Sequence, residues 1–220
     1  MGISEKSIEV IESIPYLLAG VGITLEITAL ALILGASLGL LLAIFRVYGG
    51  RVLSIFSILY GRIIRSTPLL VILFMLYFLG SEVIELSAFT ATVLALAIHT
   101  SAYQSEIFRG AIQSISKGQM EAALALGMSK FQCITTIILP QAFRRAIPYW
   151  ANEAAIVLKD SSTAYVIGVI ELMRRAEFVI ARTTRPFLTY LIVGIIYFIL
   201  TNLFTRSLAL AEKKVRVPGL

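Results

Sequence analysis

The chain has 220 residues, of which 58% are hydrophobic, and a mean hydropathy of +0.90. This composition excludes an ordinary soluble domain, and the length allows for about five or six membrane helices of ~20 residues each. The net charge of +6 would suit nucleic-acid binding, but basic cytoplasmic loops explain it better in a membrane protein.

Residues 1–13 are acidic, with Glu5, Glu9 and Glu12 against Lys6. They lack the basic start of a cleavable signal sequence. Because the cytoplasmic segments of membrane proteins are enriched in Lys and Arg, this acidic start indicates an N-terminus that faces outward.

The first predicted span covers residues 27–45, inside an apolar run that begins near Ile14. Arg46 and Arg51 follow the span directly. A basic connection of this kind belongs on the cytoplasmic side of the membrane.

The second predicted element covers residues 52–80, and Ser66-Thr67-Pro68 interrupts it. Proline removes a backbone donor and disfavours the α conformation at the residue before it. Broken helices inside transporters expose backbone groups that can hold a substrate. Ser66 and Thr67 are therefore candidate substrate-binding residues, and a simple proline kink is the alternative.

The third predicted span covers residues 86–105. Tyr103 and Glu106 are three positions apart and share one helical face, while Ser101 and Ser105 form a neighbouring stripe of small residues. We include Tyr103 and Ser105 among the candidate substrate-binding residues, although small-residue stripes more often serve helix packing.

A polar-edged segment at 116–140, SKGQMEAALALGMSKFQCITTIILP, follows the third span. Ser116 and Gln119 have the spacing of a capping box, in which each side chain satisfies a backbone N–H at a helix start. Ser129 and Gln132 repeat the same spacing. Two helices are therefore predicted in close succession.

A glycine corner is predicted between these two helices. Gly127 suits the left-handed residue that follows a helix, and Pro140 closes the second run. Each helix would have about three turns. Because such short helices neither span a bilayer nor form a soluble core, we expect the segment to dock on a soluble partner.

The fourth predicted span covers residues 146–168 and is the least apolar. Glu153 and Asp160 are seven positions apart and share one face, and Asn152 and Lys159 share the next. Charged side chains are costly at mid-membrane and usually face a cavity or a partner. Lys159 could thus receive the carboxylate of a zwitterion, and Glu153 or Asp160 its cationic group. The alternative is a Lys159–Asp160 pair that only shapes the fold.

The fifth predicted span covers residues 187–205, with Pro186 in its first turn. Basic residues outnumber acidic ones in segments 46–51, 109–145 and 206–220, which share one side of a five-span chain. The positive-inside rule then predicts an outward N-terminus and a cytoplasmic C-terminus.

Residues 171–185 fall on the outer side of this topology and yet carry four arginines against Glu171 and Glu177. Contact with an extracellular partner is one explanation for this charge. Solvation of an exposed loop is the other.

The sequence offers little for catalysis. Cys133 is the only cysteine, which excludes an internal disulfide framework and favours a buried, unreactive thiol. His99 is the only histidine and provides no metal site, and no residue is a catalytic candidate. The chain has no G-x-x-x-x-G-K-[ST] loop for binding a nucleotide.

Two other classes of membrane protein share some of these features. A proton- or sodium-driven carrier would also use intramembrane acidic residues, but it has no need of the docking segment. A membrane-embedded hydrolase would need an assembled nucleophile and base, for which the sequence has no supporting motif.

Several motifs resemble permease subunits of ATP-binding-cassette importers. Glu121-Ala122-Ala123, Gly127 and Ile137 to Pro140 match that family's E-A-A, G and I-x-L-P pattern with its spacing. Four further motifs are similar to the polar amino acid uptake group: Arg65-Ser66-Thr67-Pro68-Leu69-Leu70, Tyr103 with Glu106-Ile107-Phe108-Arg109-Gly110, Gly118-Gln119, and Leu158-Lys159-Asp160-Ser161-Ser162. Ser66 replaces a glycine of the family pattern. The resemblance covers nearly the whole chain.

The resemblance implies one transmembrane domain over residues 1–220, an all-α integral membrane protein with about five transmembrane helices and a cytoplasmic coupling helix. The implied partners are two ATP-binding-cassette ATPase subunits, a second permease copy or paralogue and an extracytoplasmic solute-binding protein. The expected setting is the cytoplasmic membrane of a prokaryote, with contacts to lipid and none to nucleic acid. ATP and Mg would bind the ATPase, so we expect no cofactor and no enzyme activity on this chain.

The implied coupling residues also make physical sense. Ala122 and Ala123 give a narrow helix that can enter a cleft on the ATPase, Leu126 supplies an apolar contact, and Gly127 sets the corner. Glu121 is expected in the first turn, where the helix dipole favours a carboxylate. An amphipathic helix lying on the membrane is the alternative.

The implied cargo is a polar amino acid moved by alternating access. Glu153 favours a basic amino acid such as arginine, lysine or histidine. Glutamine is the alternative, and the solute-binding protein can impose part of the selectivity.

Overall fold

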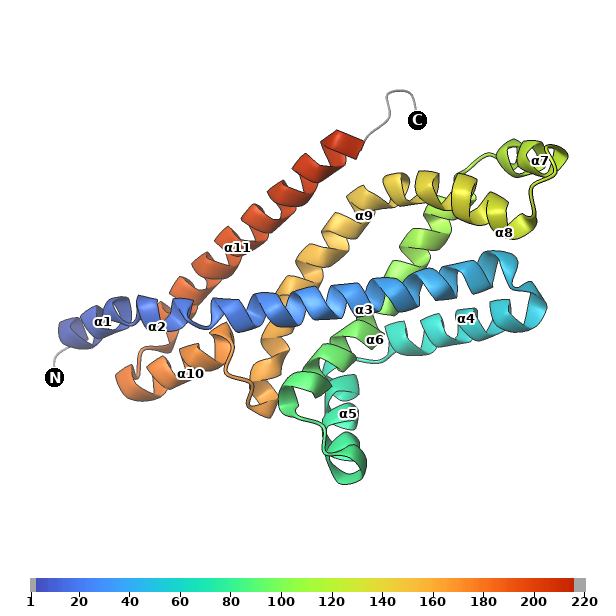
Figure 1. Cartoon of the computed structure of the whole chain (residues 1–220). Helices are drawn as coiled ribbons and strands as arrows, with labels where there is room; N and C mark the ends of the chain where they lie inside the picture. The colour runs from blue at the N-terminus through green and yellow to red at the C-terminus, as the bar shows by residue number, and fades with distance from the viewer. Residues whose placement is uncertain (1–2, 216–220) are drawn as a thin grey trace. The chain divides into compact units, whose positions relative to one another are not determined.

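The computed structural model describes the backbone of residues 3–215 and the side chains of residues 5–79 and 85–210. Within this part of the chain all regular structure is helical (Figure 1). The contacts divide the chain into two compact units. Unit 1 comprises the residues up to Ile33, Pro68–Ala97 and Ala154–Phe204, and unit 2 comprises Leu34–Thr67, Ile98–Glu153 and the residues from Thr205 onward.

Four long helices run through both units: α3 (Val21–Tyr48), α6 (Ala88–Gln113), α9 (Leu139–Asp160) and α11 (Pro186–Val215). Unit 1 adds α1 (Ile3–Glu12), α2 (Ile14–Leu18), α5 (Leu69–Ile84), a 3-10 helix (Ser161–Ile167) and α10 (Leu172–Thr183). Unit 2 adds α4 (Gly50–Ser66), α7 (Lys117–Ala125), α8 (Lys130–Gln132) and a π-helical turn (Cys133–Ile138).

The core of unit 1 joins the two N-terminal helices to α10 and α11. Along α10 the buried positions are Leu172, Ala176, Val179 and Thr183, which follow the i, i+4, i+7 and i+11 spacing of one helical face. Val10 and Leu17 pack against this face together with side chains of α11. The stretch between residues 171 and 185 is therefore a packed helix rather than a solvated loop.

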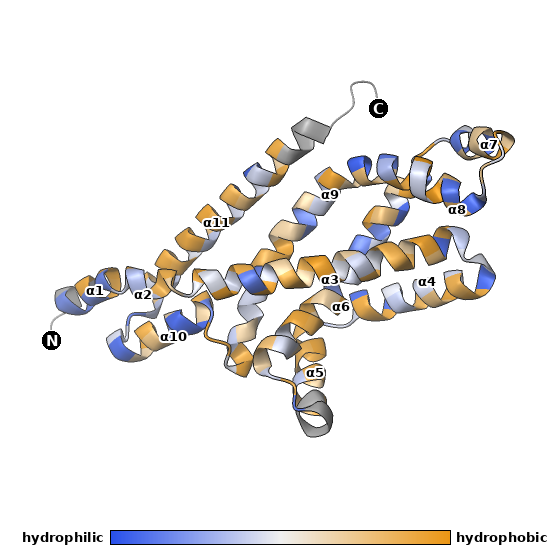
Figure 2. Ribbon diagram, in the orientation of Figure 1, coloured by the Kyte–Doolittle hydropathy of each residue, from blue (hydrophilic) through white to orange (hydrophobic). Residues whose placement is uncertain are grey.

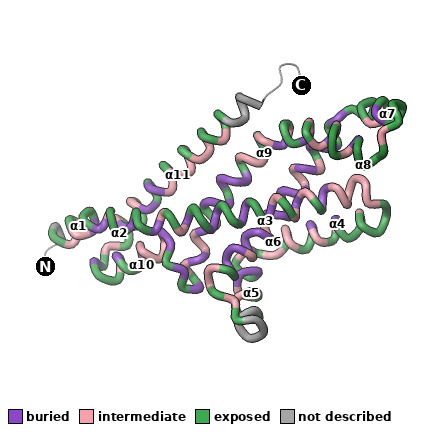
Figure 3. Tube along the Cα trace, viewed as in Figure 1, coloured by how far each residue is buried: buried purple, intermediate pink, exposed green. Residues whose placement is uncertain are grey.

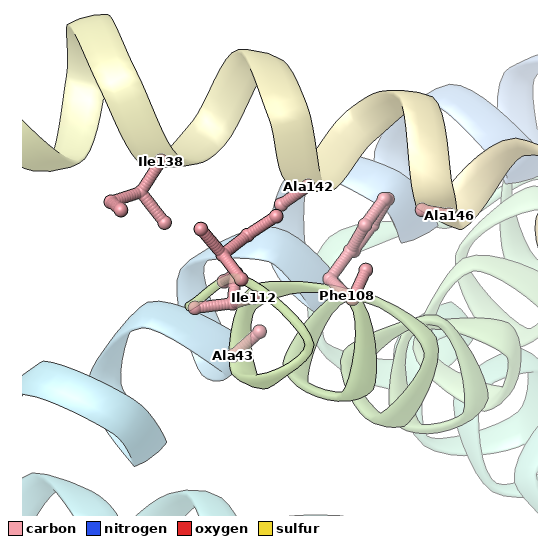
Figure 4. Packing of buried hydrophobic residues seen from close by; sticks show 8 residues of the cluster. Ala43, Phe108, Ile112, Ile138, Ala142 and Ala146 are labelled. Atoms are coloured by element: carbon pink, nitrogen blue, oxygen red, sulfur yellow. The ribbon is translucent and has the colours of Figure 1, made fainter. Parts of the chain in front are cut away.

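The core of unit 2 fixes the start of α9 against α6 and α3. Figure 4 shows Ile138, Ala142 and Ala146 lying over Phe108 and Ile112, with Ala43 of α3 in the same cluster. Four of the eight buried residues in this cluster are alanines, whose small side chains allow the helices to approach closely.

Two described helices, α3 and α11, are long and apolar enough to cross a membrane, and the broken pair of α4 with the described part of α5 raises the number to three. Figure 2 shows hydrophobic residues running along α11, whereas hydrophilic residues gather on α8 and α10. α6 and α9 are not among these apolar helices. Both carry polar side chains along their length, such as Gln104 on α6 and Glu153 on α9. The count of five spans and their orientation stay predictions.

The predicted break at Ser66-Thr67-Pro68 is confirmed, because α4 ends at Ser66 and α5 begins at Leu69. The predicted proline in the first turn of the last span is also confirmed at Pro186. Both predictions rested on the missing N–H of proline, which is a local property of the chain.

Several predicted boundaries were too short. α3 extends to Tyr48, α5 to Ile84, α6 to Gln113 and α11 to Val215. Residues 206–215 lie beyond the predicted fifth span but continue α11, whereas Arg216 lies outside the described residues. Polar residues end the apolar pattern but do not end a helix whose backbone bonds continue.

The apolar run from Ile14 is not one helix. It contains the short helix α2 and then breaks near Gly20 before α3 begins. A Cβ on Gly20 would lie 2.7 Å from the backbone N of Leu172. Glycine at this position therefore lets the chain pass directly against the start of α10.

Pro140 was predicted to close the helix after the glycine corner, and this prediction was wrong. The helical backbone continues from Lys130 through the π-helical turn Cys133–Ile138 into α9. Proline lacks an N–H and its ring crowds the carbonyl one turn earlier. The wider π-helical turn directly before Pro140 relieves this conflict, so the chain continues without a break.

Candidate functional site

The segment 116–140 forms a short helix, a corner and the root of a long helix. α7 begins after Ser116 and ends with Leu126 as its C-cap. Gly127 then adopts φ +82°, as predicted for the left-handed residue at the corner. A Cβ at Gly127 would meet no atom within 4 Å, so backbone conformation alone favours glycine there.

Only the second of the two predicted capping boxes forms. Gln132 donates its backbone N–H to Ser129 Oγ at 3.3 Å, and Ser129 donates its backbone N–H to Gln132 Oε1 at 2.8 Å. Ser116 is the N-cap of α7, but its side chain makes no capping bond. Glu121 lies beyond the first turn of α7, contrary to prediction, so the dipole at the helix start does not explain it.

Figure 3 shows mostly exposed residues along α7 and at the corner that follows it. Leu126 is 84% exposed, Phe131 is 75% exposed, and Leu124 is also exposed. Glu121 and Ala122 share this exposure, whereas Ala123 is only 5% exposed and faces its own chain. A protruding apolar tip of this kind is typical of a surface that docks on a partner.

The docking segment is attached firmly to unit 2 at both ends. Arg145 of α9 donates to the backbone O of Ser114 at 2.7 Å, which ties the end of α6 to the root of α9. Lys130 lies over the ring of Tyr48, with Nζ 5.7 Å from its centroid. Together with the apolar cluster of Figure 4, these contacts couple any movement of the corner to α3, α6 and α9.

A buried carboxylate lies farther along α9. Glu153 is 7% exposed and accepts a hydrogen bond of 2.7 Å from Thr100 Oγ1 of α6. Gln104 Nε2 donates to the same hydroxyl at 3.1 Å, and Trp150 Nε1 donates to Gln104 Oε1 at 2.7 Å. Thus two residues one turn apart on α6 join two residues one turn apart on α9.

A second charged cluster joins α3, α4 and α6 around Glu106. Arg109 Nη2 lies 2.7 Å from Glu106 Oε2, Arg65 Nη2 lies 3.4 Å from Oε1, and Arg46 also pairs with Oε1. Arg65 donates in addition to the backbone O of Ala102 at 2.9 Å. These contacts hold Arg65 against Glu106 and against the backbone of α6.

The candidate residues at the helix break differ in exposure. Ser66 is exposed at the end of α4, and Thr67 is its C-cap. Thr67 Oγ1 donates to the backbone O of Ile63, its own helix, at 2.9 Å. In this conformation that hydroxyl therefore stabilises the end of α4.

On α6 the two candidate residues lie in different surroundings. The Tyr103 ring contacts the His99 ring, with centroids 5.2 Å apart. Ser105 is buried, donates to its own backbone at Ala102, and lies against Gly39 of α3, where a Cβ would be 3.0 Å from the Ser105 N. This close approach of α3 and α6 favours the packing interpretation for Ser105.

Lys159 and Asp160 end α9, within unit 1, whereas Glu153 belongs to unit 2. Lys159 is exposed and Asp160 is partly exposed. The Asp160 backbone O accepts from Thr163 Oγ1 at 2.8 Å, at the start of the 3-10 helix that ends at Gly168, with φ +92°.

The arginines of the outer segment bind other parts of unit 1. Arg182 pairs with Glu9 of α1 at 2.7 Å and donates to Ser13 Oγ at 2.8 Å. Arg175 lies over the Tyr16 ring, 4.7 Å from its centroid. The basic charge of residues 171–185 therefore has an explanation within the chain, because the acidic N-terminal helix packs beside it.

Glu171 caps the N-terminus of α10 and is fully buried. Its carboxylate accepts from the backbone N–H of Met173 and Arg174, and from the hydroxyls of Tyr197 and Thr24. Burial raises the pKa of the Glu171 carboxyl, while these four donated bonds lower it and limit the shift.

The polar network of Thr100, Gln104 and Trp150 was not among the predicted site residues. Thr100 and Gln104 are four positions apart and so share one helical face, and this i, i+4 pair of polar residues was the available signal. Cys133 is buried and unpaired by disulfide, as predicted. Among the described residues, no group of three or more His, Cys, Asp or Glu side chains could hold a metal ion.

The described part of the chain is all-helical and contains apolar helices long enough to cross a membrane, which is the architecture of an integral membrane protein. Residues 35–217 match the family described as the inner membrane component of binding-protein-dependent transport systems. The chain belongs to this family.

Curated relatives and a solved structure indicate which kind of transport protein within this family the chain resembles. The chain is 39% identical to a nopaline transport system permease protein of Agrobacterium fabrum, over 92% of this chain and 89% of that protein. It is 36% identical to a glutamine transport system permease protein of Escherichia coli, over 93% and 95% respectively. A crystal structure of an amino acid ABC transporter with histidines has 37% identity and a TM-score of 0.83, covering 93% of this chain and 96% of that one.

The chain is thus the permease of an amino acid ABC importer in the inner membrane. It is not itself an enzyme, because ATP hydrolysis in this family belongs to a separate subunit. The ion-driven carrier and the membrane hydrolase are excluded by this family membership.

Proposed function

We propose that this permease carries a basic amino acid such as arginine, lysine or histidine by alternating access. The observation that carries the proposal is the buried carboxylate of Glu153. A carboxylate inside a membrane protein is costly unless it serves a pathway or a partner. In this proposal Glu153 accepts the cationic group of the cargo.

The other candidate residues have supporting roles in the proposal. Lys159 attracts the α-carboxylate, and Asp160 provides a second acceptor on the Glu153 side of α9. Ser66, Thr67 and Tyr103 line the pathway beside the break between α4 and α5. Ser105 has a packing role in α6.

The energy enters through the docking segment in this proposal. Two ATPase subunits close on ATP and Mg, and each receives the α7 corner of one permease copy or paralogue. Leu126 supplies the apolar contact, Glu121 and Ala122 flank it, and Gly127 holds the corner. The buried Ala123 packs α7 against the rest of the permease. An extracytoplasmic solute-binding protein delivers the amino acid from the other side.

Glutamine is the second candidate cargo. It is favoured by the relative in Escherichia coli, whose name refers to glutamine transport. The α-ammonium group of any amino acid could also bind a carboxylate. Glu153 therefore favours a basic amino acid over glutamine only if it contacts the cationic side chain of the cargo.

A competition experiment tests the cargo. Radiolabelled arginine is bound to the purified permease–ATPase complex, without the solute-binding protein, and displaced by lysine, histidine or glutamine. We expect the basic amino acids to displace it at lower concentration than glutamine. Glu153→Gln should weaken arginine binding by about 10- to 100-fold, because a charged hydrogen bond is lost. Preferential displacement by glutamine would contradict a basic cargo.

A substitution at the corner tests coupling. Gly127→Ala places a Cβ in the left-handed region at a cost of about 1 kcal/mol, and we expect it to lower solute-stimulated ATP hydrolysis in the reconstituted complex. Gly22→Ala is the matched control, since that helical glycine also has open space around it. Equal ATP hydrolysis in both variants would refute the role of the corner.

A further inference from the structure

The buried bonds between α6 and α9 form an ordered chain that ends on Glu153. It runs from Trp150 to Gln104, then to Thr100, then to the carboxylate, with donor–acceptor distances of 2.7, 3.1 and 2.7 Å. Gln104 and Thr100 are buried, as is Glu153. All four side chains lie within unit 2.

The chemistry of Trp150 fixes the donor-to-acceptor direction of the whole series of hydrogen bonds. An indole N–H can only donate, so the Gln104 side chain must turn its oxygen toward Trp150. Its NH₂ group then faces Thr100 and donates to the hydroxyl oxygen. The hydroxyl hydrogen is left for Glu153, which accepts it at Oε1.

Every bond in the chain therefore donates toward Glu153. Aligned hydrogen bonds strengthen one another in a medium of low dielectric, and a donated bond stabilises negative charge on a carboxylate. The Thr100 bond also occupies Oε1 and thereby holds the orientation of the carboxyl group. Glu153 is in this way held as a fixed acceptor although it is buried.

We propose that Trp150, Gln104 and Thr100 are positioning residues that hold Glu153 as the acceptor for the cationic group of the transported amino acid. The three do not touch the cargo and act through the carboxylate. This inference rests on the proposed contact between Glu153 and the cargo. It adds residues of α6 and the single tryptophan to the determinants of specificity.

The series of hydrogen bonds can be interrupted without changing the shape of α6. Thr100→Val removes the hydroxyl and keeps the volume, and Thr100→Ser keeps the hydroxyl. Thr92→Val is the matched control, because Thr92 is also buried on α6 but its hydroxyl donates to its own backbone at Ala88. Trp150→Phe removes the donor at the far end and retains an aromatic ring.

The experiment measures the Kd of radiolabelled arginine for the purified permease–ATPase complex without the solute-binding protein. Thr100→Val should raise the Kd by about 10-fold, in line with the loss of a hydrogen bond to a charged group. Trp150→Phe should raise it by about 3-fold, and Thr100→Ser and Thr92→Val should leave it within about 2-fold.

A second background separates positioning from general stability. In a Glu153→Gln protein, Thr100→Val should change the Kd by less than about 2-fold, because the effect acts through the carboxylate. An equal loss in both backgrounds, or an equal loss for Thr92→Val, would overturn the positioning role while leaving the Glu153 contact intact. An unchanged Kd for Glu153→Gln alone would overturn both.

Discussion

Glu171 both caps the start of its own helix and binds side chains of two other helices. Its carboxylate satisfies two backbone N–H groups at the start of α10, which a helix end requires. The same carboxylate binds Thr24 of α3 and Tyr197 of α11. One buried acid therefore fixes α10 to two membrane-length helices.

The raised pKa of Glu171 predicts a pH dependence of stability. Since the folded value lies above the usual value of 4.5, the folded state holds the extra proton between these two values. The contribution of Glu171 to stability is thus fully present below pH ~4.5 and declines as pH rises through the folded value, by at most about 1.4 kcal/mol per pH unit.

The measurement is the thermal midpoint of the purified protein in detergent as a function of pH. Glu171→Gln removes the titrating group, so its midpoint should fall less between pH 4.5 and 7 than that of the unsubstituted protein. Glu12→Gln is the control, because Glu12 is exposed on α1 and should keep the original slope. Identical slopes in all three proteins would contradict the assignment.

At the scale of elements, Glu106 is the point at which α3, α4 and α6 meet. Three arginines share its two oxygens, and the glycine at position 61 leaves room for Arg65, whose Nη1 would lie 2.9 Å from an added Cβ. Such a network contributes more to stability than isolated surface ion pairs do, because each carboxylate oxygen is already oriented by another partner.

A pair of substitutions on α4 tests this network. Arg65→Gln should lower the thermal midpoint of the purified protein by about 2–4 °C, corresponding to roughly 1 kcal/mol for a part-buried ion pair and its bond to Ala102. Arg62→Gln should leave the midpoint within about 1 °C, since Arg62 is exposed on the same helix. Equal shifts would show that the cluster contributes no specific stability.

At the scale of the whole molecule, the orientation in the membrane is the central expectation. The acidic N-terminal segment is predicted outside, and the docking segment is predicted in the cytoplasm. The native thiol at Cys133 is buried and should not react with a soluble reagent. New cysteines can therefore report the side on which they lie.

Labelling with a membrane-impermeant maleimide tests the orientation. Glu12→Cys should react in intact cells, and Lys117→Cys should react only after the membrane is permeabilised, because both positions are exposed but are predicted on opposite sides. Unsubstituted protein is the control and should stay unlabelled. Reaction of Lys117→Cys in intact cells would reverse the predicted topology.

Local backbone chemistry was the part of the fold that sequence predicted well. The break at Pro68, the left-handed corner at Gly127 and the capping box at Ser129 depend on a few neighbouring residues, and each is present. The end predicted at Pro140 failed because a π-helical turn accommodates the proline. That alternative depends on the packing of Ile138 and Ala142 against α6, which no local pattern contains.

Composition and motif spacing determined by themselves that this chain is a helical membrane permease with a docking segment, because hydropathy and turn chemistry act over short stretches of chain. Only the tertiary structure decided what the charged side chains contact. Glu153 binds Thr100, which lies 53 residues away in sequence. Glu106 pairs with Arg46, 60 residues away, and Arg182 pairs with Glu9 near the other end of the chain. Side chains so far apart in sequence meet only when helices pack, so no local pattern contains these contacts.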